Sequence, residues 1–365
     1  MALNGLFGGI YSGRAVLVTG HTGFKGSWLM YWLTQLGAHV SGLALDPDTS
    51  PSHWNLLGLE DVHDQRVDLR DAAAVCAVLE SERPEIVFHL AAQPLVRRSY
   101  RDPVGTFDAN VLGLVNLYEA IRRCPSVRVI VNATTDKVYA DRTTDNGYRE
   151  TDQLGGHDPY STSKACAELV SDSYRKSYFG NDDGRGFAVR LATARAGNVI
   201  GGGDWAEDRL VPDLVRAGIS NSPLVLRNPK AIRPWQHVLE PLAGYLRLGQ
   251  ALFNGEVAEG AWNFGPDNDG ELSVGALASR LMARWPSLRI EHDQTSQPHE
   301  AAILRLNCDK ARHDLAWRPL WDIETTISRT VDWYRTFHET GKLLTSDDLI
   351  AYTNDARRSG LVWAS

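Results

Sequence analysis

Two residues four positions apart, Tyr160 and Lys164 in the segment YSTSK, could together take a proton from a hydroxyl group. On a helix, positions i and i+4 lie on one face, so the lysine ammonium would favour the ionised form of the phenol. A tyrosine whose pKa is lowered in this way can act as a general base. Tyrosine and lysine are also common on exposed helix surfaces, and taken alone this spacing fits a surface pair equally well.

Three glycines at intervals of three, Gly20, Gly23 and Gly26 in TGHTGFKG, could form a site for a pyrophosphate. They stand between an expected strand and an expected helix, where backbone N–H groups and the helix dipole can approach phosphate. Asp46, after the next strand, would bind an adenosine ribose and repel a 2′-phosphate, which favours NAD over NADP. The simpler alternatives are a glycine turn that only packs helix on strand and an Asp-Pro pair that only begins a turn.

The elements that would carry these residues alternate between strands and helices. Apolar runs predict buried strands at residues 15–19, 39–45, 86–92 and 129–135. Apolar residues at helical spacing predict a helix from the glycine turn to residue 37, and further helices at 111–123, 161–178, 272–285 and 323–337. This alternation predicts an α/β protein built on a Rossmann fold, a doubly wound parallel sheet with helices on its faces.

The local composition of the chain changes at residue 197, where expected loops rich in Gly, Pro and Trp begin. A chain of 365 residues exceeds the size at which one hydrophobic core usually stops growing. We therefore expect an NAD-binding Rossmann domain at 1–196 and a smaller C-terminal α/β substrate-binding lobe at 197–365, with some interleaving of the chain between them.

The composition excludes several classes of protein. A net charge of −7 argues against nucleic acid as the main partner, because phosphate backbones require concentrated Lys and Arg. The four cysteines are scattered without zinc-like or disulfide spacing, so we expect free thiols, no bound metal and a reducing compartment. No apolar run reaches membrane-spanning length and the first residues lack a signal-peptide pattern, which together predict a cytoplasmic protein with no membrane partner.

From Gly20 to the WxP segment near Trp317, the chain resembles the extended short-chain dehydrogenase/reductase family, in its NAD-dependent sugar epimerase/dehydratase type. The resemblance implies tightly bound NAD, a nucleotide-sugar substrate and a Thr-Tyr-Lys catalytic group. Thr135, in NATTDKVY, would hydrogen-bond the 4-hydroxyl of the sugar, Tyr160 would be the base and Lys164 its partner. The residues expected at the cofactor are Gly20, Thr22, Gly23, Phe24, Lys25, Gly26, Asp46, Asp68, Leu69, Ala91, Ala92, Gln93, Asn110, Thr134, Tyr160 and Lys164.

The residue after Thr135 separates two reactions within this family. Nucleotide-sugar 4,6-dehydratases carry an acid there, epimerases of similar fold generally do not, and this chain has Asp136. The resemblance implies that Tyr160 takes the 4-hydroxyl proton while hydride passes from C4 to NAD, and the resulting ketone acidifies the C5 proton. Asp136, kept protonated by a raised pKa in a desolvated site, would then protonate the departing 6-hydroxyl, and hydride would return to C6.

Lys137 distinguishes this chain from the dTDP-glucose members, which have Glu at that position to remove the C5 proton. In this respect the chain resembles the members that act on CDP-glucose, which also have Lys at that position. A lysine must be neutral to act as a base, and Lys137 could instead orient water or neutralise the enolate. The role of Lys137 therefore stays open between these alternatives.

Four further segments resemble the subgroup of these dehydratases that acts on CDP-glucose, namely HTGFKGSWL, LAAQPLVRRSY, ARAGNVIGGGDWAEDRLVPD and IRPWQHV. This resemblance implies conversion of CDP-D-glucose to CDP-4-dehydro-6-deoxy-D-glucose, a step in dideoxysugar biosynthesis for lipopolysaccharide O-antigen. The residues expected at the substrate are Gln93, Arg97, Asn198, Arg209, Leu210, Val211, Arg233 and His299. Arginine forks suit two phosphates, although each arginine could equally form a surface ion pair and Gln93 could simply belong to a loop.

Two other functions share parts of this pattern. A nucleotide-sugar 4-epimerase would use Tyr160, Lys164 and NAD, and a silent dinucleotide-binding scaffold would keep only the fold. Asp136 and Lys137 argue against the first, and the complete group of Thr135, Tyr160 and Lys164 argues against the second. The family generally dimerises through the helix bearing Tyr160 and its neighbour at 111–123, so we expect a homodimer or a dimer of dimers, with a monomer as the alternative.

Overall fold

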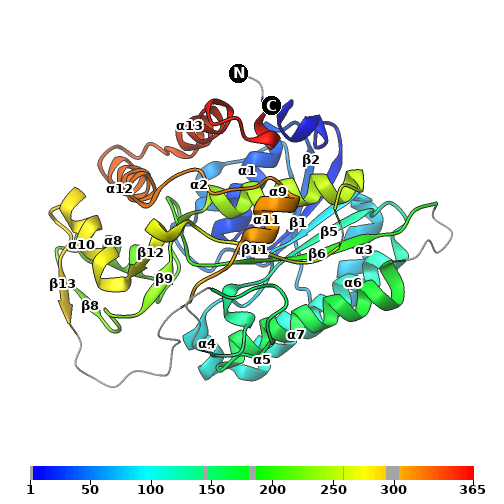
Figure 1. Cartoon of the computed structure of the whole chain (residues 1–365), viewed down its shortest axis with the longest axis horizontal. Coiled ribbons are helices and arrows are strands. Elements are labelled where there is room, and N and C mark those ends of the chain that lie inside the picture. The colour runs from blue at the N-terminus through cyan, green and yellow to red at the C-terminus, as the bar shows by residue number, and fades with distance from the viewer. Residues whose placement is uncertain (1–2, 143–146, 181–185, 258, 293–303) are drawn as a thin grey trace.

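The computed structural model describes residues 3–142, 147–180, 186–257, 259–292 and 304–365. Within these residues, a parallel sheet of seven strands lies at the centre and helices cover both of its faces (Figure 1). In spatial order the strands are β11 (Gly260–Phe264), β6 (Arg190–Ala196), β5 (Val129–Ala133), β4 (Ile86–His89), β1 (Ala15–Thr19), β2 (His39–Ala44) and β3 (His63–Arg66). This architecture confirms the predicted α/β class and doubly wound Rossmann sheet.

The strand order reverses between β1 and β4, which is where such sheets bind their ligands. From β1 the chain runs outward to β2 and β3, whereas from β4 it runs the other way to β5 and β6. The diverging connections leave a crevice at the carboxyl ends of the strands. Thr19, His89 and Ala133 end β1, β4 and β5 beside this crevice. The predicted strands at 86–92 and 129–135 therefore stop early, and their last residues form the loops that line it.

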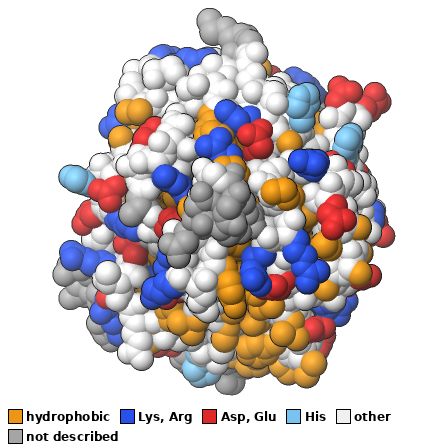
Figure 2. All heavy atoms as spheres, turned by 90° about the vertical axis from the view of Figure 1, so that its right-hand side faces the viewer, with side chains coloured by type: hydrophobic (Ala, Val, Ile, Leu, Met, Phe, Trp, Pro, Cys, Tyr) orange, Lys and Arg blue, Asp and Glu red, His pale blue; other side chains and the backbone are white. Residues whose placement is uncertain are grey.

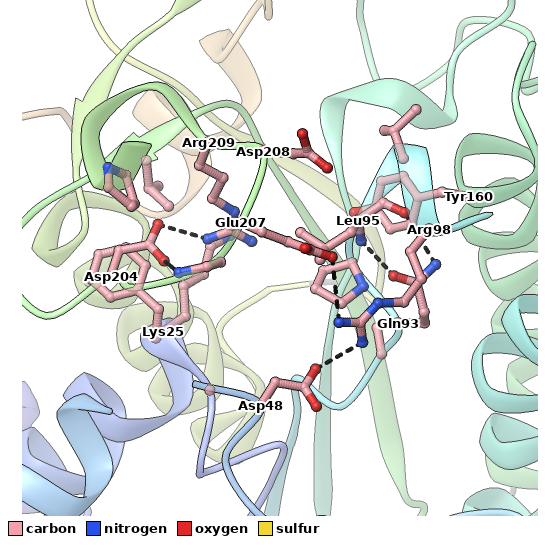
Figure 3. Close-up of a pocket in the computed structure, with 18 of the residues that line it drawn as sticks. Lys25, Asp48, Gln93, Leu95, Arg98, Tyr160, Asp204, Glu207, Asp208 and Arg209 are labelled. Carbon is pink, nitrogen blue, oxygen red and sulfur yellow. Dashed lines mark hydrogen bonds and ion pairs between the residues drawn. The ribbon is translucent and has the colours of Figure 1, made fainter. Parts of the chain in front are cut away.

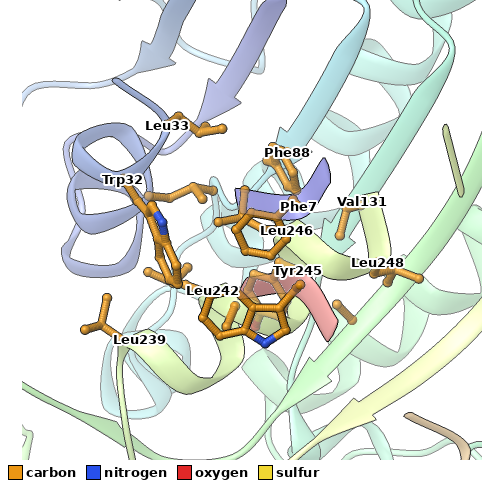
Figure 4. Close-up of a cluster of buried hydrophobic side chains, with 14 of the residues drawn as sticks. Phe7, Trp32, Leu33, Phe88, Val131, Leu239, Leu242, Tyr245, Leu246 and Leu248 are labelled. Carbon is orange, nitrogen blue, oxygen red and sulfur yellow. The ribbon is translucent and has the colours of Figure 1, made fainter. Parts of the chain in front are cut away.

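One face of the sheet packs against α1 (Phe24–Gln35) and α9 (Leu239–Asn254). Successive residues of a strand point to opposite faces, so Val16 and Val18 of β1 join this core. Figure 4 shows Trp32 of α1 and Tyr245 of α9 among its members. Most residues of α9 are buried, and the helix packs against this face of the sheet.

The other face packs against α3 (Ala72–Glu82), α6 (Gly113–Arg123) and α7 (Pro159–Tyr174). Leu17 of β1 and Leu117 of α6 belong to this second core. The predicted helices at 111–123 and 161–178 thus both cover the sheet, and both lie on this same face. Helix α6 follows a π-helical turn, η2 (Asp108–Leu112), and α7 runs into another, η4 (Arg175–Phe179).

The second lobe forms around a third core made by α8 (Leu210–Ile219), α10 (Val274–Arg284) and α12 (Ile323–Thr340). Its three small sheets pair β7 (Val199–Ile200) with β10 (Gln236–His237), β8 (Leu224–Leu226) with β13 (Ile290–His292), and β9 (Ile232–Pro234) with β12 (Glu271–Ser273). The first residues of the helix predicted at 272–285 belong to β12, because they pair with β9. The chain beyond residue 197 also supplies β11 and α9 to the first lobe, so the chain passes between the lobes more than once. The division into domains at residue 197 stays a prediction.

The two ends of the chain meet on the outer side of α1 (Figure 1). The ring of Phe7 stacks on that of Trp363, with centroids 5.0 Å apart. Phe7 belongs to η1 (Leu6–Gly9) and Trp363 to η6 (Val362–Ala364), which follows α13 (Thr345–Arg358). The remaining short helices are α2 (His53–Leu57), α4 (Val96–Arg101), α5 (Pro103–Phe107), η3 (Asp136–Val138), η5 (Asn268–Gly270) and α11 (Asp309–Asp314).

Three negative findings hold for the described part of the chain. None of its helices combines the length and apolar character needed to cross a membrane. No group of His, Cys, Asp and Glu in it is arranged to hold a metal ion. Its four cysteines are free thiols, two of them buried.

Asp348, in the first turn of α13, is a source of pH-dependent stability. Its side chain is 1% exposed and its Oδ2 atom has no hydrogen-bond partner among the described residues. Burial raises the pKa of this carboxyl to about 7. Because the folded pKa lies above the unfolded one, folding favours the protonated acid. Its contribution to stability is complete below the unfolded pKa and is lost as the pH rises through about 7.

We predict that Asp348→Asn weakens the pH dependence of stability. In the unaltered protein, deprotonation of Asp348 should lower the free energy of unfolding by about 2 to 3 kcal/mol between about pH 5 and about pH 8. Asp348→Asn should lack this decrease. Denaturant titrations at both pH values measure this difference. Glu60→Gln, which alters an exposed acid that is not among the charges acting on Asp348, is the matched control and should keep the original dependence. An unchanged dependence in Asp348→Asn would contradict the prediction.

Candidate active site

A large cleft of about 940 Å³ lies over the crevice of the sheet and is lined by both lobes. Figure 3 shows Lys25 of α1, Tyr160 of α7 and Arg209 before α8 around it. A volume near the upper end of those known for ligand sites suits a dinucleotide together with a second ligand. Most predicted site residues meet here: Gly20, Thr22, Gly23, Phe24, Lys25, Gly26, Asp46, Asp68, Leu69, Ala91, Ala92, Gln93, Arg97, Thr134, Thr135, Asp136, Lys137, Tyr160, Lys164, Asn198, Arg209, Leu210, Val211 and Arg233.

Two predicted residues are not among the cleft-lining residues. Asn110 lies behind the wall of the cleft, where its Oδ1 accepts from the backbone N–H of Gln93 at 2.7 Å and its Nδ2 donates to Ser163 at 2.9 Å. Its contacts make Asn110 a support for the loop after β4 rather than a direct cofactor contact. His299 lies outside the described residues.

The glycine turn after β1 is built for close approach of the backbone. Gly20 has a φ of +72°, in the left-handed region that favours glycine. A Cβ at Gly26 would lie 2.1 Å from the carbonyl oxygen of Gly20, so only glycine fits at that position. Gly23 caps α1 without a side-chain hydrogen bond, which leaves the start of this twelve-residue helix open to the cleft. Such a turn fits the pyrophosphate of a dinucleotide.

We predict that Gly26→Ala weakens the binding of NAD at least about tenfold, because the added methyl group must displace the backbone of Gly20. Gly5→Ala is the matched control. Gly5 is not among the cleft-lining residues and an added Cβ there would meet nothing within 4 Å, so the loss of affinity should be much smaller. Cofactor content after purification and a fluorescence titration with NAD measure both variants. Equal affinities in the two variants would refute the close-approach argument.

The loops after β2 and β3 carry the two acids predicted at the adenosine, Asp46 at the ribose and Asp68 at the adenine. The Asp46 side chain is 89% exposed and its carboxylate lies 3.8 Å from the guanidinium of Arg66. Asp68 accepts a two-pronged hydrogen bond from Arg70, which lowers the pKa of its carboxyl. Both acids line the cleft, and we retain their contacts with the ribose and adenine as predictions.

Helix α7 positions Tyr160 and Lys164 on one buried face. Asp158 caps the helix by accepting from the Ser161 N–H at 2.9 Å, and Pro159 occupies its first turn. Tyr160 is 8% exposed and Lys164 is 4% exposed. The Lys164 ammonium donates to the carbonyl oxygen of Ala133 at the end of β5, at 3.1 Å. The helix is thereby tied to the strand that carries the other reactive residues.

The prediction that the pKa of Tyr160 is lowered is wrong for the protein without bound ligands. Burial raises the pKa of Tyr160 to about 12, and the nearby Thr135 hydroxyl only partly opposes this effect. Burial also lowers the pKa of Lys164 to about 8, and its ammonium is bonded to a carbonyl group. The spacing places both side chains on one buried face of α7, but the cost of ionising a buried phenol outweighs the hydrogen bond of Thr135 and the charge of Arg209.

Glu168, a residue that the sequence motifs did not indicate, holds this arrangement together. It lies one turn beyond Lys164 and accepts hydrogen bonds from Thr134 at 2.5 Å and Thr193 at 2.7 Å. Its ion pair with Arg195, at 2.8 Å, is almost fully buried. The charge of Glu168 also favours the protonated form of Lys164. The signal in the sequence was the continued spacing of four residues from Tyr160 through Lys164 to Glu168.

Asp136 has the properties that a buried acid requires. It is 2% exposed, its Oδ1 accepts from the Thr135 hydroxyl at 3.0 Å, and its Oδ2 has no hydrogen-bond partner among the described residues. Burial raises the pKa of its carboxyl, opposed by the charges of Lys137, Arg233 and Lys25 and by the Thr135 hydrogen bond. The raised pKa agrees with the protonated state that a proton donor needs.

The substrate side of the cleft carries arginines in ion pairs that a diphosphate could replace. Arg209 lies 2.9 Å from Asp204, and Arg97 lies 3.8 Å from Asp208. The Gln93 side chain is held within its own loop, where it donates to the Leu95 carbonyl and accepts from the Leu95 N–H. That geometry fits the alternative in which Gln93 shapes the loop.

A network of ion pairs over the cleft was not indicated by the sequence motifs (Figure 3). Arg98 of α4 lies 2.9 Å from Asp48, which follows β2, and 3.7 Å from Glu207 in the second lobe. Arg101 also contacts Glu207, at 3.2 Å. The arginine-rich segment VRRSYR was visible in the sequence, but its partners lie far away along the chain.

Residues 16–265 match the NAD dependent epimerase/dehydratase family. The chain belongs to this family. A CDP-glucose 4,6-dehydratase of Salmonella typhimurium is 45% identical over 329 residues, 89% of this chain and 91% of that protein. A dTDP-glucose 4,6-dehydratase of Neisseria gonorrhoeae is 28% identical and covers 88% of this chain and 95% of its own. The UDP-glucose 4-epimerase of Thermus thermophilus, solved with NAD, has a TM-score of 0.76 at 28% identity, covering 88% of this chain and 98% of its own.

Membership of the epimerase/dehydratase family confirms the predicted resemblance and makes NAD the cofactor of this enzyme. When bound, NAD accepts a hydride from the substrate and returns one to it. The cradle at Gly20 and Gly26 fits its pyrophosphate, because glycines at these positions expose the backbone before α1 to the cleft. The 4,6-dehydratases among the relatives favour dehydration over epimerisation and over a silent scaffold.

Proposed function

We propose that this enzyme converts CDP-D-glucose to CDP-4-dehydro-6-deoxy-D-glucose and water, with NAD reduced and reoxidised within each turnover. The observation that carries the proposal is Asp136, a buried acid with a raised pKa, beside Thr135 and Tyr160 in one cleft. Similarity to a CDP-glucose 4,6-dehydratase supports cytosine as the nucleobase of the substrate. The product would feed dideoxysugar biosynthesis, including that of lipopolysaccharide O-antigen.

Each catalytic residue has one task in this proposal. Tyr160 is the base that takes the proton of the 4-hydroxyl, for which its phenol must first ionise against the pKa of about 12 that burial gives it. Thr135 holds that hydroxyl by a hydrogen bond. Asp136 gives its proton to the departing 6-hydroxyl. Lys137 follows directly and lines the same cleft, which suits a base for the C5 proton or a cation for the enolate.

The diphosphate of the substrate is assigned to Arg209 and Arg233. Arg209 precedes α8, whose first residues, Leu210 and Val211, line the cleft, and Arg233 lies on β9 with 3% exposure. Guanidinium groups bind phosphate with two parallel hydrogen bonds, so they would exchange their present acidic or carbonyl partners for phosphate oxygens. Asn198 lines the same part of the cleft.

A mass-spectrometric assay of the purified enzyme tests this function. CDP-glucose, dTDP-glucose, UDP-glucose and GDP-mannose are each incubated with the NAD-loaded protein. A product lighter by one water from CDP-glucose alone is the expected result. An isobaric product would indicate an epimerase, water loss from another nucleotide sugar would change the substrate, and no turnover of any would revive the scaffold alternative.

The assembly proposed for this enzyme is a homodimer, or a dimer of dimers, formed through α6 and α7. Figure 2 shows hydrophobic side chains gathered low on the molecule, the level at which Figure 1 places these helices. The exposed apolar residues Leu112 and Leu169 lie beside α6 and on α7 and support this surface. Free thiols support a cytoplasmic location. Light scattering of the purified protein measures the assembly.

A further inference from the structure

Lys25 lies in the cofactor turn, yet its side chain reaches the reactive end of the cleft. It is the second residue of α1, and its ammonium donates a hydrogen bond to the hydroxyl of Tyr245 at 3.5 Å. The ammonium also lies 5.9 Å from the centre of the Tyr245 ring. Tyr245 comes from α9 and is fully buried. Two elements far apart in the sequence therefore hold this cation in place.

Lys25 and the proposed proton donor Asp136 line the same cleft, and the charge of each shifts the pKa of the other. Burial, together with Arg209 and Lys164, lowers the pKa of Lys25 to about 8, whereas the carboxylate of Asp136 opposes the shift. The same contact appears on the other partner, because the charge of Lys25 lowers the pKa of Asp136. Burial and the charges of Tyr160 and Asp136 raise the pKa of Tyr245.

Asp136 needs a positive partner when it has given up its proton. Its Oδ2 atom is buried and has no hydrogen-bond partner among the described residues, so a carboxylate there lacks a donor. Three cations face it from separate elements: Lys137 from η3, Arg233 from β9 and Lys25 from α1. Tyr160 is the other titratable group of the reaction centre nearby, since Asp136 raises its pKa.

Two of these cations have other tasks in the proposed function. Lys137, whether it takes the C5 proton as a neutral base or neutralises the enolate as a cation, acts on the substrate. Arg233 is assigned to the diphosphate of the substrate. Lys25 forms no ion pair within the described part of the chain and is held by a neutral phenol, which leaves its charge available to Asp136.

We propose that Lys25, anchored by Tyr245, is a positioning residue of the dehydration step that stabilises the carboxylate left on Asp136. This inference rests on the proposed function. In the step, the Asp136 proton moves to the 6-oxygen and the C6–O bond breaks, its electron pair leaving with water. The C5 proton passes to a base such as Lys137, and the electrons of that bond form the C5–C6 double bond. Lys25 itself neither gains nor loses a proton.

Lys25→Met and Tyr245→Phe test the inference with CDP-glucose. We expect Lys25→Met to bind NAD and to reduce it in the first turnover at close to the original rate. Its kcat should fall on the order of tenfold to a hundredfold, because Asp136 becomes a weaker acid. Reduced cofactor should then accumulate during turnover, seen by its absorbance. Tyr245→Phe should show a smaller effect in the same direction.

The pH profile separates this role from a merely structural one. Removal of a nearby cation raises the pKa of Asp136, so the limb along which kcat falls with rising pH should move to higher pH. Tyr118→Phe, which removes another buried hydroxyl that bonds to Ser171, is the matched control and should leave the limb in place. Thermal unfolding and NAD content are recorded for each variant. If Lys25→Met does not fold, Tyr245→Phe carries the test.

Three results would decide against one of the two proposals. An unchanged pH limb without accumulation of reduced cofactor would overturn the role of Lys25. Loss of bound NAD, with the original kcat restored at saturating NAD, would also overturn it and assign Lys25 to the cofactor alone. Absence of water loss in the unaltered enzyme would instead refute the proposed function, which the first assay detects before any variant is made.

Discussion

Asp136→Asn should stop the loss of water and leave the first hydride transfer intact. Asparagine has nearly the same shape, and its side-chain oxygen can still accept from the Thr135 hydroxyl at the present 3.0 Å. It has no acidic proton to give to the departing 6-hydroxyl, so kcat should fall by about 10² to 10⁴. Incubation with CDP-glucose should produce a stoichiometric absorbance of reduced cofactor without a product lighter by one water.

Another buried acid provides the control for this variant. Asp348→Asn removes a carboxyl that is equally buried but belongs to α13 and is not among the cleft-lining residues. Its kcat should match that of the unaltered enzyme. Turnover by Asp136→Asn within about tenfold of the original rate would show that another group protonates the leaving hydroxyl.

Tyr160→Phe should block the reaction one step earlier. The variant lacks the phenol that takes the proton of the 4-hydroxyl, so neither reduced cofactor nor dehydrated product should form. We expect kcat to fall by about 10³ or more, near the upper range for loss of a general base. Stopped-flow absorbance after mixing with CDP-glucose measures the first hydride transfer directly.

The two substitutions together order the steps. Asp136→Asn should accumulate reduced cofactor and Tyr160→Phe should not, although both should fail to form the product. Tyr118→Phe, which alters a buried tyrosine that bonds to Ser171 and Asn132, should keep nearly full activity. Reduced cofactor formed at the normal rate by Tyr160→Phe would transfer the role of base to another residue.

The strands that surround the cofactor turn were predictable because their signals are local. β1 begins and ends at the predicted residues, and α1 lies within the predicted helix. An apolar run before a glycine turn leaves few alternatives for the backbone. The residues brought to the carboxyl ends of those strands, such as Asp136, then follow from the topology of a parallel sheet.

The elements that were missed depend on contacts distant in the sequence. Helix α9 has polar residues on one side, but the chain near residues 315–321 covers them: Glu240 accepts from the Trp321 N–H and Arg247 donates to the Leu315 carbonyl. Strand β11 is short and pairs with β6 from some seventy positions away. Single-sequence patterns do not contain such pairings.

The site showed the same limit in its electrostatics. Residue types and spacing located Tyr160 and Lys164, but the pKa of each is governed by burial, which depends on the whole fold. The ion pairs of Arg98 with Asp48 and Glu207 join segments that no motif connects. Asn110, predicted at the cofactor, is not among the cleft-lining residues, and its hydrogen bond to Gln93 joins segments that no motif connects.

The stack of Phe7 on Trp363 has a consequence for how the protein is made. Trp32 of α1 and Tyr352 of α13 lie in the same aromatic cluster, with ring centroids 5.9 Å apart. A ribosome releases Phe7 and Trp32 long before it reaches Tyr352 and Trp363. During synthesis the rings of Phe7 and Trp32 therefore stay exposed until α13 and the residues after it are made. Until then the nascent chain presents an apolar surface that a chaperone can bind.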